Sequence, residues 1–299
     1  MPHAAPAPAR PLLSPIVAGC WRMDTWGWSP RERLGWIEAC VERGVTSFDH
    51  ADIYGGYTVE GLFGEALALA PPSLRRQLQL VSKCGIQIVA TERPQHRHKA
   101  YATSAAHIEA SVEHSLRALR TDHLDLLLIH RPDPLLDADE VAGVFQRLRE
   151  AGKVLAFGAS NFHPAQFELL HDRIPLATHQ VECSPLQVDG LHDGTFDQAQ
   201  RLRLRPMLWS PLAGGRLVNG VDEAARRVRS RLAAFAAELD VTPATLAYAW
   251  GLRLPSRPHV IVGSRRVEAI DEAVAALDVQ LDAPRWHALW SAGAGRELP

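Results

Sequence analysis

Four side chains in this sequence are of types that can donate, accept or stabilise a proton. Each stands shortly after an apolar or β-branched run. Asp49 and Tyr54 follow residues 45–48, Lys83 follows residues 78–81, and His130 follows residues 124–129. The ordinary pKa of tyrosine, about 10, is high for a group that must exchange a proton at neutral pH. A nearby lysine ammonium lowers that pKa, and an aspartate keeps the lysine charged. We therefore predict that Tyr54 is a general acid for a carbonyl oxygen, with His130 orienting the carbonyl or sharing the proton.

This chemistry needs a hydride, which protein side chains cannot supply, so it implies a nicotinamide cofactor. Trp209 is suited to stack on the nicotinamide ring, and the amides of Asn161 and Gln180 are suited to bind its carboxamide. The loop from Ser210 through Gly214 offers close backbone approach to a pyrophosphate, and Arg216 adds positive charge. Gly263, Ser264, Arg265 and Arg266 stand at a predicted helix start, and two arginines there favour NADPH over NADH.

The segments that would position these residues alternate regularly along the chain. Apolar or β-branched runs typical of buried parallel strands occupy residues 12–19, 45–48, 78–81, 124–129, 154–159, 177–181, 207–209 and 260–262. Amphipathic patterns typical of helices follow them, and Ser29-Pro30-Arg31-Glu32 reads as a capping box. Eight such units predict an α/β fold, a single (β/α)8 TIM barrel with a short C-terminal tail. A doubly wound open sheet is the alternative, but no GxGxxG follows the first strand.

The predicted domain organisation is simple. Residues 1–11, rich in alanine and proline, are expected to form a loose tail, and residues 12–299 are expected to form one barrel domain. Residues 87–103 are polar and are expected to form a long inserted loop, which is uncommon unless it has a function. Trp21 and Trp26 follow the first strand and are candidates for the substrate pocket, although Trp26 could equally pack against the first helix.

Composition narrows the class of protein. Hydrophobic residues make up 46% and charged residues 22% of 299, and the formal net charge is −2, which is ordinary for a soluble globular protein. Nothing indicates nucleic acid, a membrane or an obligate protein partner; a small carbonyl compound is the expected partner. Four widely spaced cysteines and the lack of a secretory signature predict reduced thiols and a cytoplasmic location. No metal site is predicted.

The same residues carry a resemblance to a known family. Its motifs here are Phe48-Asp49-x-Ala51-x-x-Tyr54-Gly55, Ser82-Lys83, His130-Arg131-Pro132-Asp133, Gly158-x-Ser160-Asn161-Phe162, Trp209-Ser210-Pro211-Leu212 and Gly263-Ser264. The chain resembles aldo-keto reductases from end to end, most closely a bacterial branch of aldo-keto oxidoreductases. The resemblance implies NADPH-dependent carbonyl reduction by Asp49, Tyr54, Lys83 and His130. It also implies cofactor contacts at Ser160, Asn161, Gln180, Trp209, Ser210, Leu212 and residues 263–266.

The sequence departs from the family pattern at two positions, and it is compatible with two other functions. Ala269 and Ala273 stand where many members have an arginine and an asparagine for the adenosine end of the cofactor. A nucleotide-binding sensor with little turnover would use the same fold. A metal-dependent hydrolase built on Asp49, Asp52 and His130 would leave Lys83 without a role. We expect Asp52 to lie in an exposed loop or to cap a helix, and His50 to be a neighbour of the site rather than a participant.

Overall fold

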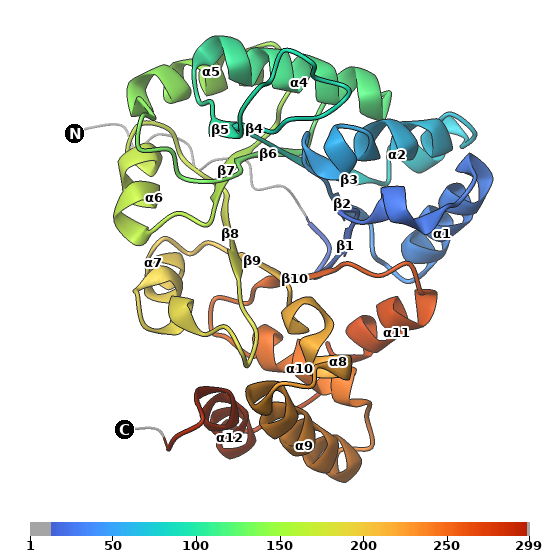
Figure 1. Ribbon diagram of the computed structural model, residues 1–299, viewed down its shortest axis with the longest axis vertical. Helices are drawn as coiled ribbons and strands as arrows, with labels where there is room; N and C mark the ends of the chain where they lie inside the picture. The colour runs from blue at the N-terminus through green and yellow to red at the C-terminus, as the bar shows by residue number, and fades with distance from the viewer. Residues whose placement is uncertain (1–12, 298–299) are drawn as a thin grey trace. The chain divides into compact units, whose positions relative to one another are not determined.

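The computed structural model describes residues 13–297, and the predicted tail at 1–11 lies outside these described residues. Eight parallel strands close into a barrel in the order β1-β10-β9-β8-β7-β6-β3-β2. The predicted fold class is therefore confirmed. Figure 1 shows helices and strands alternating along the chain, as the sequence pattern predicts. Among the described residues, no helix is long and apolar enough to cross a membrane.

Within the described residues, the chain divides into two compact units. The first contains Cys20–Glu38 and Thr46–His179, and the second contains Ser14–Gly19, Ala39–Val45 and the chain from Gln180 onward. The prediction of one barrel domain across residues 12–299 stays a prediction. Asp49, Tyr54, Lys83 and His130 all belong to the first unit.

The first unit holds four parallel strands covered by helices. The strands are β2 Ser47–Asp49, β3 Gln79–Cys84, β6 Leu126–Ile129 and β7 Phe157–Ser160, paired β2–β3, β3–β6 and β6–β7. The helices are α1 Pro30–Glu42, whose residues from Ala39 onward belong to the second unit, α2 Val59–Leu67, α3 Pro72–Arg75, α4 Ala105–Leu119, α5 Ala138–Glu150 and α6 Pro164–His171. Two short 3-10 turns, η1 Met23–Trp26 and η2 Tyr54–Gly56, follow strands β1 and β2 along the chain.

Side-chain caps explain where several helices begin. The predicted capping box of α1 is present: the Ser29 N–H donates to Glu32 at 2.7 Å, and the Glu32 N–H donates to the Ser29 hydroxyl at 3.3 Å. Ser104 caps α4 and Asp137 caps α5 in the same manner, each accepting from backbone N–H groups of the first turn. These bonds satisfy donors that have no partner within the helix.

The segment predicted as a long loop contains secondary structure. Strands β4 Ile86–Gln87 and β5 Ala100–Tyr101 pair antiparallel and bring the two ends of the segment together. The Ile88 N–H donates to the Tyr57 hydroxyl at 3.1 Å, which ties the ribbon to the turn after η2. Strands of two residues carry no readable periodicity, so the sequence pattern could not reveal this ribbon.

The second unit is built in the same way. Its strands are β1 Ile16–Gly19, β9 Met207–Trp209 and β10 His259–Val262, while β8 Thr178–Glu182 begins in the first unit and continues into the second. Its helical elements are η3 Asp189–Leu191, α7 Thr195–Arg201, η4 Ala213–Gly215, α8 Arg216–Asn219, α9 Glu223–Glu238, α10 Pro243–Leu252, α11 Val267–Ala275 and α12 Ala283–Ala294. Thr242 caps α10, as predicted, by accepting from the Thr245 N–H at 3.1 Å.

The short C-terminal tail is helical and docked. The rings of Trp286 on α12 and Trp250 on α10 stack with centroids 4.9 Å apart, and each indole N–H donates to the backbone carbonyl of the other residue. A Cβ on Gly293 of α12 would lie 1.7 Å from the Pro185 carbonyl oxygen, so only glycine fits this approach. In Figure 1, α12 lies beside α9. The sequence analysis missed α12, because its docking depends on these tertiary contacts.

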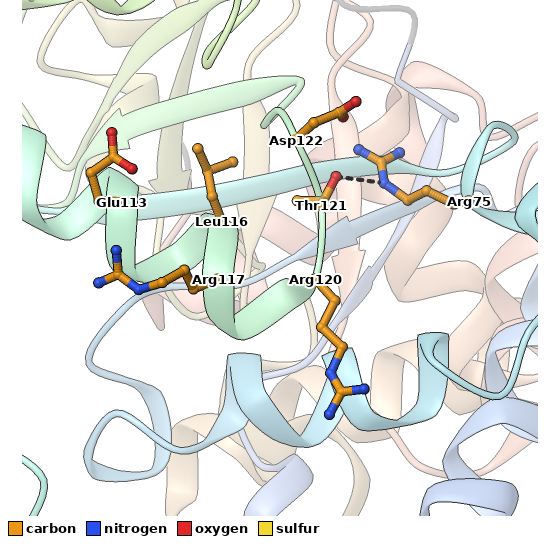
Figure 2. Close-up of a pocket in the computed structure, with 7 residues that line it drawn as sticks. All are labelled: Arg75, Glu113, Leu116, Arg117, Arg120, Thr121 and Asp122. Carbon is orange, nitrogen blue, oxygen red and sulfur yellow. Dashed lines mark hydrogen bonds between the residues drawn. The ribbon is translucent and has the colours of Figure 1, made fainter.

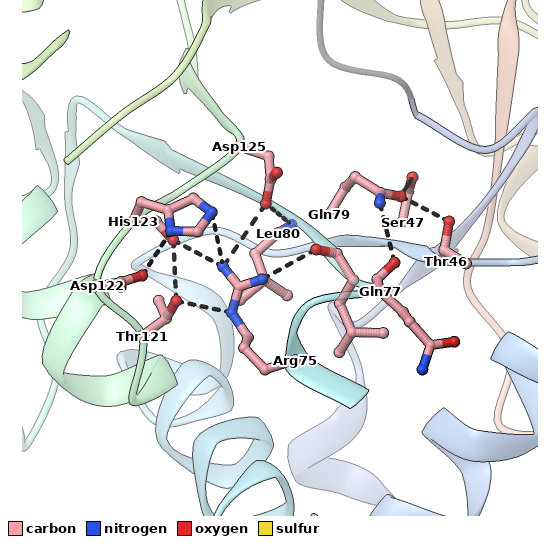
Figure 3. A network of polar contacts seen from close by, with 11 residues as sticks. Thr46, Ser47, Arg75, Gln77, Gln79, Leu80, Thr121, Asp122, His123 and Asp125 are labelled. Atoms are coloured by element: carbon pink, nitrogen blue, oxygen red, sulfur yellow. Dashed lines mark hydrogen bonds and ion pairs between the residues drawn. The ribbon is translucent and has the colours of Figure 1, made fainter. Parts of the chain in front are cut away.

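An arginine network holds the amino ends of two neighbouring strands in the first unit (Figure 3). The guanidinium of Arg75 donates to the Thr121 hydroxyl at 2.8 Å and to the carbonyls of Leu78 and His123. Asp125, which interrupts the apolar run before β6, accepts from the Leu80 N–H at 2.8 Å. A half-buried carboxylate is tolerated here because it is hydrogen-bonded and faces an arginine.

The close packing of α2 against α4 yields a first prediction. A Cβ on Gly64 would lie 2.0 Å from the Ala118 carbonyl oxygen, whereas a Cβ on Gly61 of the same helix meets nothing within 4 Å. We expect Gly64→Ala to lower the free energy of unfolding by about 1–3 kcal/mol through overpacking. Gly61→Ala should instead raise it, by about 0.5–1 kcal/mol, through the better helix propensity of alanine. Urea unfolding of both variants measures this, and equal stability of the two would contradict the packing.

Candidate active site

Three of the predicted catalytic residues form a buried hydrogen-bonded group around the Lys83 ammonium. Lys83 Nζ lies 2.8 Å from both carboxylate oxygens of Asp49, 3.0 Å from the Tyr54 hydroxyl and 2.7 Å from the His50 carbonyl oxygen. Lys83 is 1% exposed and Asp49 is 4% exposed. A buried charge is tolerated only when it is paired, and Asp49 provides that pairing with both oxygens.

The local fold explains why these groups meet. Asp49 is the last residue of β2 and Lys83 lies near the end of β3, and the two strands pair in parallel with Asp49 opposite Val81. The chain then turns at η2, where Gly55 has a φ of +57° and a Cβ would lie 2.7 Å from the Thr58 hydroxyl. Only glycine adopts this crowded left-handed conformation readily. The turn returns Tyr54 to the strand end that carries Lys83.

His130 stands directly after β6 and faces the tyrosine. Its backbone N–H donates to the Cys84 carbonyl at 2.8 Å, and its ring lies edge-on to that of Tyr54 with centroids 5.9 Å apart. The imidazole is 8% exposed, and its Nδ1 has no hydrogen-bond partner among the described residues. Burial, aided by the charge of Lys83, holds the pKa of His130 well below its usual range. The ring is therefore neutral at physiological pH and can donate a hydrogen bond to a carbonyl.

The electrostatics of Tyr54 differ from the sequence-based expectation. The sequence suggested that Lys83 would lower the pKa of Tyr54. In the structure, burial raises that pKa above its ordinary value, Lys83 offsets only part of the rise, and Asp49 adds to it. Burial alone would lower the pKa of Lys83, but Asp49 and Tyr54 together raise it. Tyr54 is thus held protonated beside an ammonium that is charged at neutral pH, which is the state a proton donor needs.

His50 and Asp52 are both buried, although we expected Asp52 to lie in an exposed loop or to cap a helix. Asp52 is 3% exposed and accepts from the Ser111 hydroxyl at 2.9 Å, because α4 packs over the turn that carries it. The His50 ring is fully buried against Phe63, and burial lowers its pKa to about 3. Neither ring nitrogen of His50 has a hydrogen-bond partner among the described residues. His50 thus contributes its backbone carbonyl to Lys83, while its ring packs edge-on against Phe63.

Sequence reasoning missed Glu60, which is also buried next to this group. Its Oε1 accepts from the Ser82 hydroxyl at 2.6 Å, one residue before Lys83. The signal was present in the pattern: Glu60 lies on the stripe of α2 that also carries Phe63 and Leu67, both buried. A carboxylate on the apolar face of a helix must be paired, protonated or functional.

The predicted cofactor residues are distributed over both units. In the first unit, Ser160 is the buried last residue of β7, and Asn161 follows in the left-handed region with φ +59°, its amide donating to the Ser160 hydroxyl at 2.7 Å. In the second unit, Gln180 is buried in β8, where its amide lies 3.8 Å from the Met207 sulfur. Trp209 ends β9 and Ser210 follows it, both half-buried.

Two segments of the second unit present backbone and charge at strand ends. Leu212 and Gly214 belong to the turn after β9, and Arg216 beyond them binds Asp222 through two nitrogens at 2.8 and 3.1 Å. After β10, Gly263 and Arg265 are exposed, and the Ser264 hydroxyl accepts from the Arg266 N–H at 3.2 Å. Ala269 and Ala273 are buried in α11. The charge of Arg216 is thus already paired, whereas Arg265 faces solvent.

The two candidate pocket residues lie in different surroundings. Trp21 is 56% exposed, and its ring lies 6.4 Å from that of Tyr54, so it borders the proton donor. Trp26 is 8% exposed, and its ring packs edge-on against Trp28 and Trp36, each with centroids 4.9 Å apart. Trp36 belongs to α1. Trp26 therefore anchors the segment after β1 to the first helix, and Trp21 is the better candidate for contact with substrate.

A hollow elsewhere in the first unit does not belong to this site. Figure 2 shows its lining, which comes from α3, the end of α4 and the turn after it: Arg75, Glu113, Leu116, Arg117, Arg120, Thr121 and Asp122. Arg75 is hydrogen-bonded to Thr121 there and to the Leu78 carbonyl, just before β3 begins. Lys83 lies toward the opposite end of β3. Among the described residues, no group of three or more His, Cys, Asp or Glu side chains is placed to hold a metal ion.

Comparison with known proteins identifies the family. Residues 15–293 match the model of the aldo/keto reductase family. The chain belongs to the aldo/keto reductase family. It is 50% identical to oxidoreductase YdhF of Escherichia coli over 98% of both chains. It is 43% identical to a 6-dehydroglucose reductase of Agrobacterium fabrum over 96% of both chains.

The fold of the chain is also similar to that of a solved aldo/keto reductase. The crystal structure of an aldo/keto reductase from Klebsiella pneumoniae, in complex with NADP and acetate, superposes with a TM-score of 0.75. The two sequences are 26% identical, and the match covers 93% of this chain and 90% of that one. The protein is therefore an oxidoreductase of this family, and the Escherichia and Agrobacterium relatives are bacterial.

Proposed function

We propose that this aldo/keto reductase reduces an aldehyde or ketone to an alcohol with NADPH, and that Tyr54 donates the proton. The observation that carries the proposal is the buried Lys83 ammonium, which touches Asp49 and the Tyr54 hydroxyl at once. Such an arrangement holds a phenol protonated while a cation beside it stabilises the phenolate left after proton transfer. Electrostatic stabilisation of this kind acts most strongly in a buried site.

The residues of the chain divide the work as follows. His130, neutral and edge-on to Tyr54, donates a hydrogen bond to the substrate carbonyl oxygen and orients it. Tyr54 then transfers its proton to that oxygen, and Lys83 stabilises the resulting phenolate. Asp49 keeps the ammonium charged and aimed. Asp49, Lys83 and His130 act from the ends of strands and Tyr54 from the turn η2, so little reorganisation accompanies the transfer.

NADP(H) is the proposed cofactor, and it would supply the hydride when bound. The residues present fit such a group: a Cβ added to Gly214 or Gly263 would meet nothing within 4 Å, so the backbone at both is open to close approach. Arg265 is exposed beside Gly263 and is suited to a 2′-phosphate, which supports NADPH over NADH. The Klebsiella relative was solved with NADP. Ser160, Asn161, Gln180, Trp209, Ser210, Leu212 and Ser264 keep their predicted contacts as proposals.

The proposed substrate is a small polar aldehyde of the sugar type. The Agrobacterium relative is named for reduction of 6-dehydroglucose, an oxidised sugar. Trp21 offers an exposed ring beside Tyr54, and aromatic faces suit the C–H surfaces of sugars. A cytoplasmic location belongs to the same proposal, supported by four free cysteines, all buried.

A binding titration followed by a substrate panel tests this proposal. We expect NADPH to bind more tightly than NADH, and NADPH absorbance to fall only when a carbonyl compound is added. Arg265→Ala should weaken NADPH binding by about 1–3 kcal/mol, the range for a hydrogen bond to a charged group, and leave NADH binding unchanged. Tight NADPH binding without turnover on any aldehyde or ketone would contradict the reductase function.

A further inference from the structure

Two more carboxyl groups are buried next to Lys83, and the proposed mechanism uses neither. Asp52 is 3% exposed and Glu60 is 1% exposed. One oxygen of each, Asp52 Oδ1 and Glu60 Oε2, has no hydrogen-bond partner among the described residues. Burying two such groups costs free energy, so a role that apolar side chains could not fill is expected for them. The contacts of Asp52 and Glu60 indicate this role.

The carboxylate of Glu60 and the backbone of Asp52 hold the segment of β3 that carries Lys83. Glu60 Oε1 accepts from the hydroxyl of Ser82, the residue before Lys83, at 2.6 Å. The Asp52 N–H donates to the Lys83 carbonyl at 3.1 Å, and its carboxylate accepts from Ser111 on α4. Lys83 is thus fixed from its backbone and from the neighbouring side chain. Its ammonium has to reach Asp49 and Tyr54 from that position.

The charge of this pair changes near neutral pH. Burial, strengthened by repulsion from Glu60, raises the pKa of Asp52 to about 8. Burial also raises the pKa of Glu60 to about 7, against the opposing hydrogen bonds of Ser82 and Ser115. The charged or titratable groups that act on the pair are Lys83 and Cys84 of β3, Tyr57 after η2, and Arg93 between β4 and β5. From α4, the hydroxyl of Ser111 bonds Asp52 and the hydroxyl of Ser115 bonds Glu60.

We propose that Glu60 is a positioning residue of the proton-transfer site, which together with Asp52 holds Lys83 against Tyr54 and tunes how firmly Tyr54 keeps its proton. This inference rests on the proposed function. When the pair is ionised, its negative charge favours the charged form of Lys83 and opposes formation of the Tyr54 phenolate. When the pair is neutral, Tyr54 releases its proton more readily. Reduction should therefore slow as the pH rises through the range in which the pair ionises.

The variant Glu60→Gln tests the inference, because its amide oxygen can still accept from Ser82 while its charge is removed. The first readout is the phenolate absorbance of Tyr54, taken as the difference between each protein and its Tyr54→Phe counterpart. We expect the pKa of Tyr54 to fall by about half a unit to one unit relative to the native protein, from the loss of one nearby charge at high effective dielectric. Glu65→Gln, on the same helix with its side chain 49% exposed, is the matched control and should leave the titration unchanged.

The second readout is the pH profile of kcat for carbonyl reduction. We expect the fall in the native enzyme between pH of about 6 and 9 to flatten in Glu60→Gln, while KM changes little. If Glu60 had a purely structural role, Glu60→Gln would lower the stability of the protein and change neither the Tyr54 titration nor the pH profile of kcat. If Glu60→Gln does not fold, Asp52→Asn takes its place with the same expected direction. A Tyr54 titration that superimposes on that of the native protein overturns the inference. Absence of turnover would overturn the proposed reductase function and leave the titration to decide this one.

Discussion

Replacing Tyr54 with phenylalanine is expected to slow carbonyl reduction by about 10²–10⁴-fold, the usual contribution of a positioned general acid. The substitution removes the hydroxyl that lies 3.0 Å from Lys83 Nζ and leaves the ring in place beside Trp21 and His130. NADPH binding should be unchanged, because none of the proposed cofactor contacts involves this hydroxyl. Steady-state rates at saturating NADPH, together with a fluorescence titration of the cofactor, measure the two effects separately.

The exposed Tyr101 of β5 provides the control for this prediction. Tyr101→Phe removes a phenol hydroxyl from the same unit and should leave the rate of reduction as it is in the native protein. A Tyr54→Phe variant that retains a rate close to the native one would show that the proton comes from another group.

Replacing Lys83 with methionine is expected to lower the free energy of unfolding by about 3–5 kcal/mol, as removal of one partner from a buried ion pair typically does. Asp49 would remain buried without a counter-charge, because its two oxygens both contact Lys83 Nζ at 2.8 Å. Asn at position 49 removes the orphaned charge, so the double variant Lys83→Met with Asp49→Asn should recover much of the loss. Urea unfolding of the two single variants and the double variant measures the coupling.

The unfolding measurements should be made at neutral pH, because of the direction in which the pKa of Lys83 is shifted. Its pKa is raised in the folded protein, so its contribution to stability is present at neutral pH and is lost only as the pH rises above the ordinary range of lysine. Lys153→Met is the control, because Lys153 pairs with Glu113 at the surface, where such pairs contribute about 0–1 kcal/mol. If Lys83→Met were no less stable than Lys153→Met, the buried pair would not have the role given to it here.

Much of the barrel could be predicted because its signal is repeated and local. Apolar runs ending in polar residues identify a strand and its carboxyl end together, and parallel strands bring those ends to one side of a sheet. This is why Asp49, Lys83 and Tyr54, read separately from the sequence, are found in contact. Strand boundaries were less accurate: β7 begins at Phe157, three residues after the predicted start, and Val154 pairs with Leu124 only as an isolated bridge.

Features that depend on tertiary contacts could not be read from the sequence. Asp52 looked like an exposed loop residue, and only the packing of α4, with Ser111 against its carboxylate, shows that it is buried. The pKa of Tyr54 depends on whether burial or Lys83 has the larger effect, and residue types alone cannot decide that balance. The docking of α12 depends on Trp250 and Trp286, which lie 36 residues apart in sequence. Glu60 was readable in principle, as a charge on an apolar helix face.

The most direct test of the account is a single-turnover measurement with NADPH bound in advance. Native protein and Tyr54→Phe are loaded with NADPH, mixed rapidly with a sugar aldehyde, and followed by the nicotinamide absorbance. We predict that native protein consumes one equivalent of NADPH rapidly, and that Tyr54→Phe consumes it about 10²–10⁴-fold more slowly at equal cofactor occupancy. Equal single-turnover rates for the two proteins would contradict the claim that Tyr54, held beside Lys83, is the proton donor.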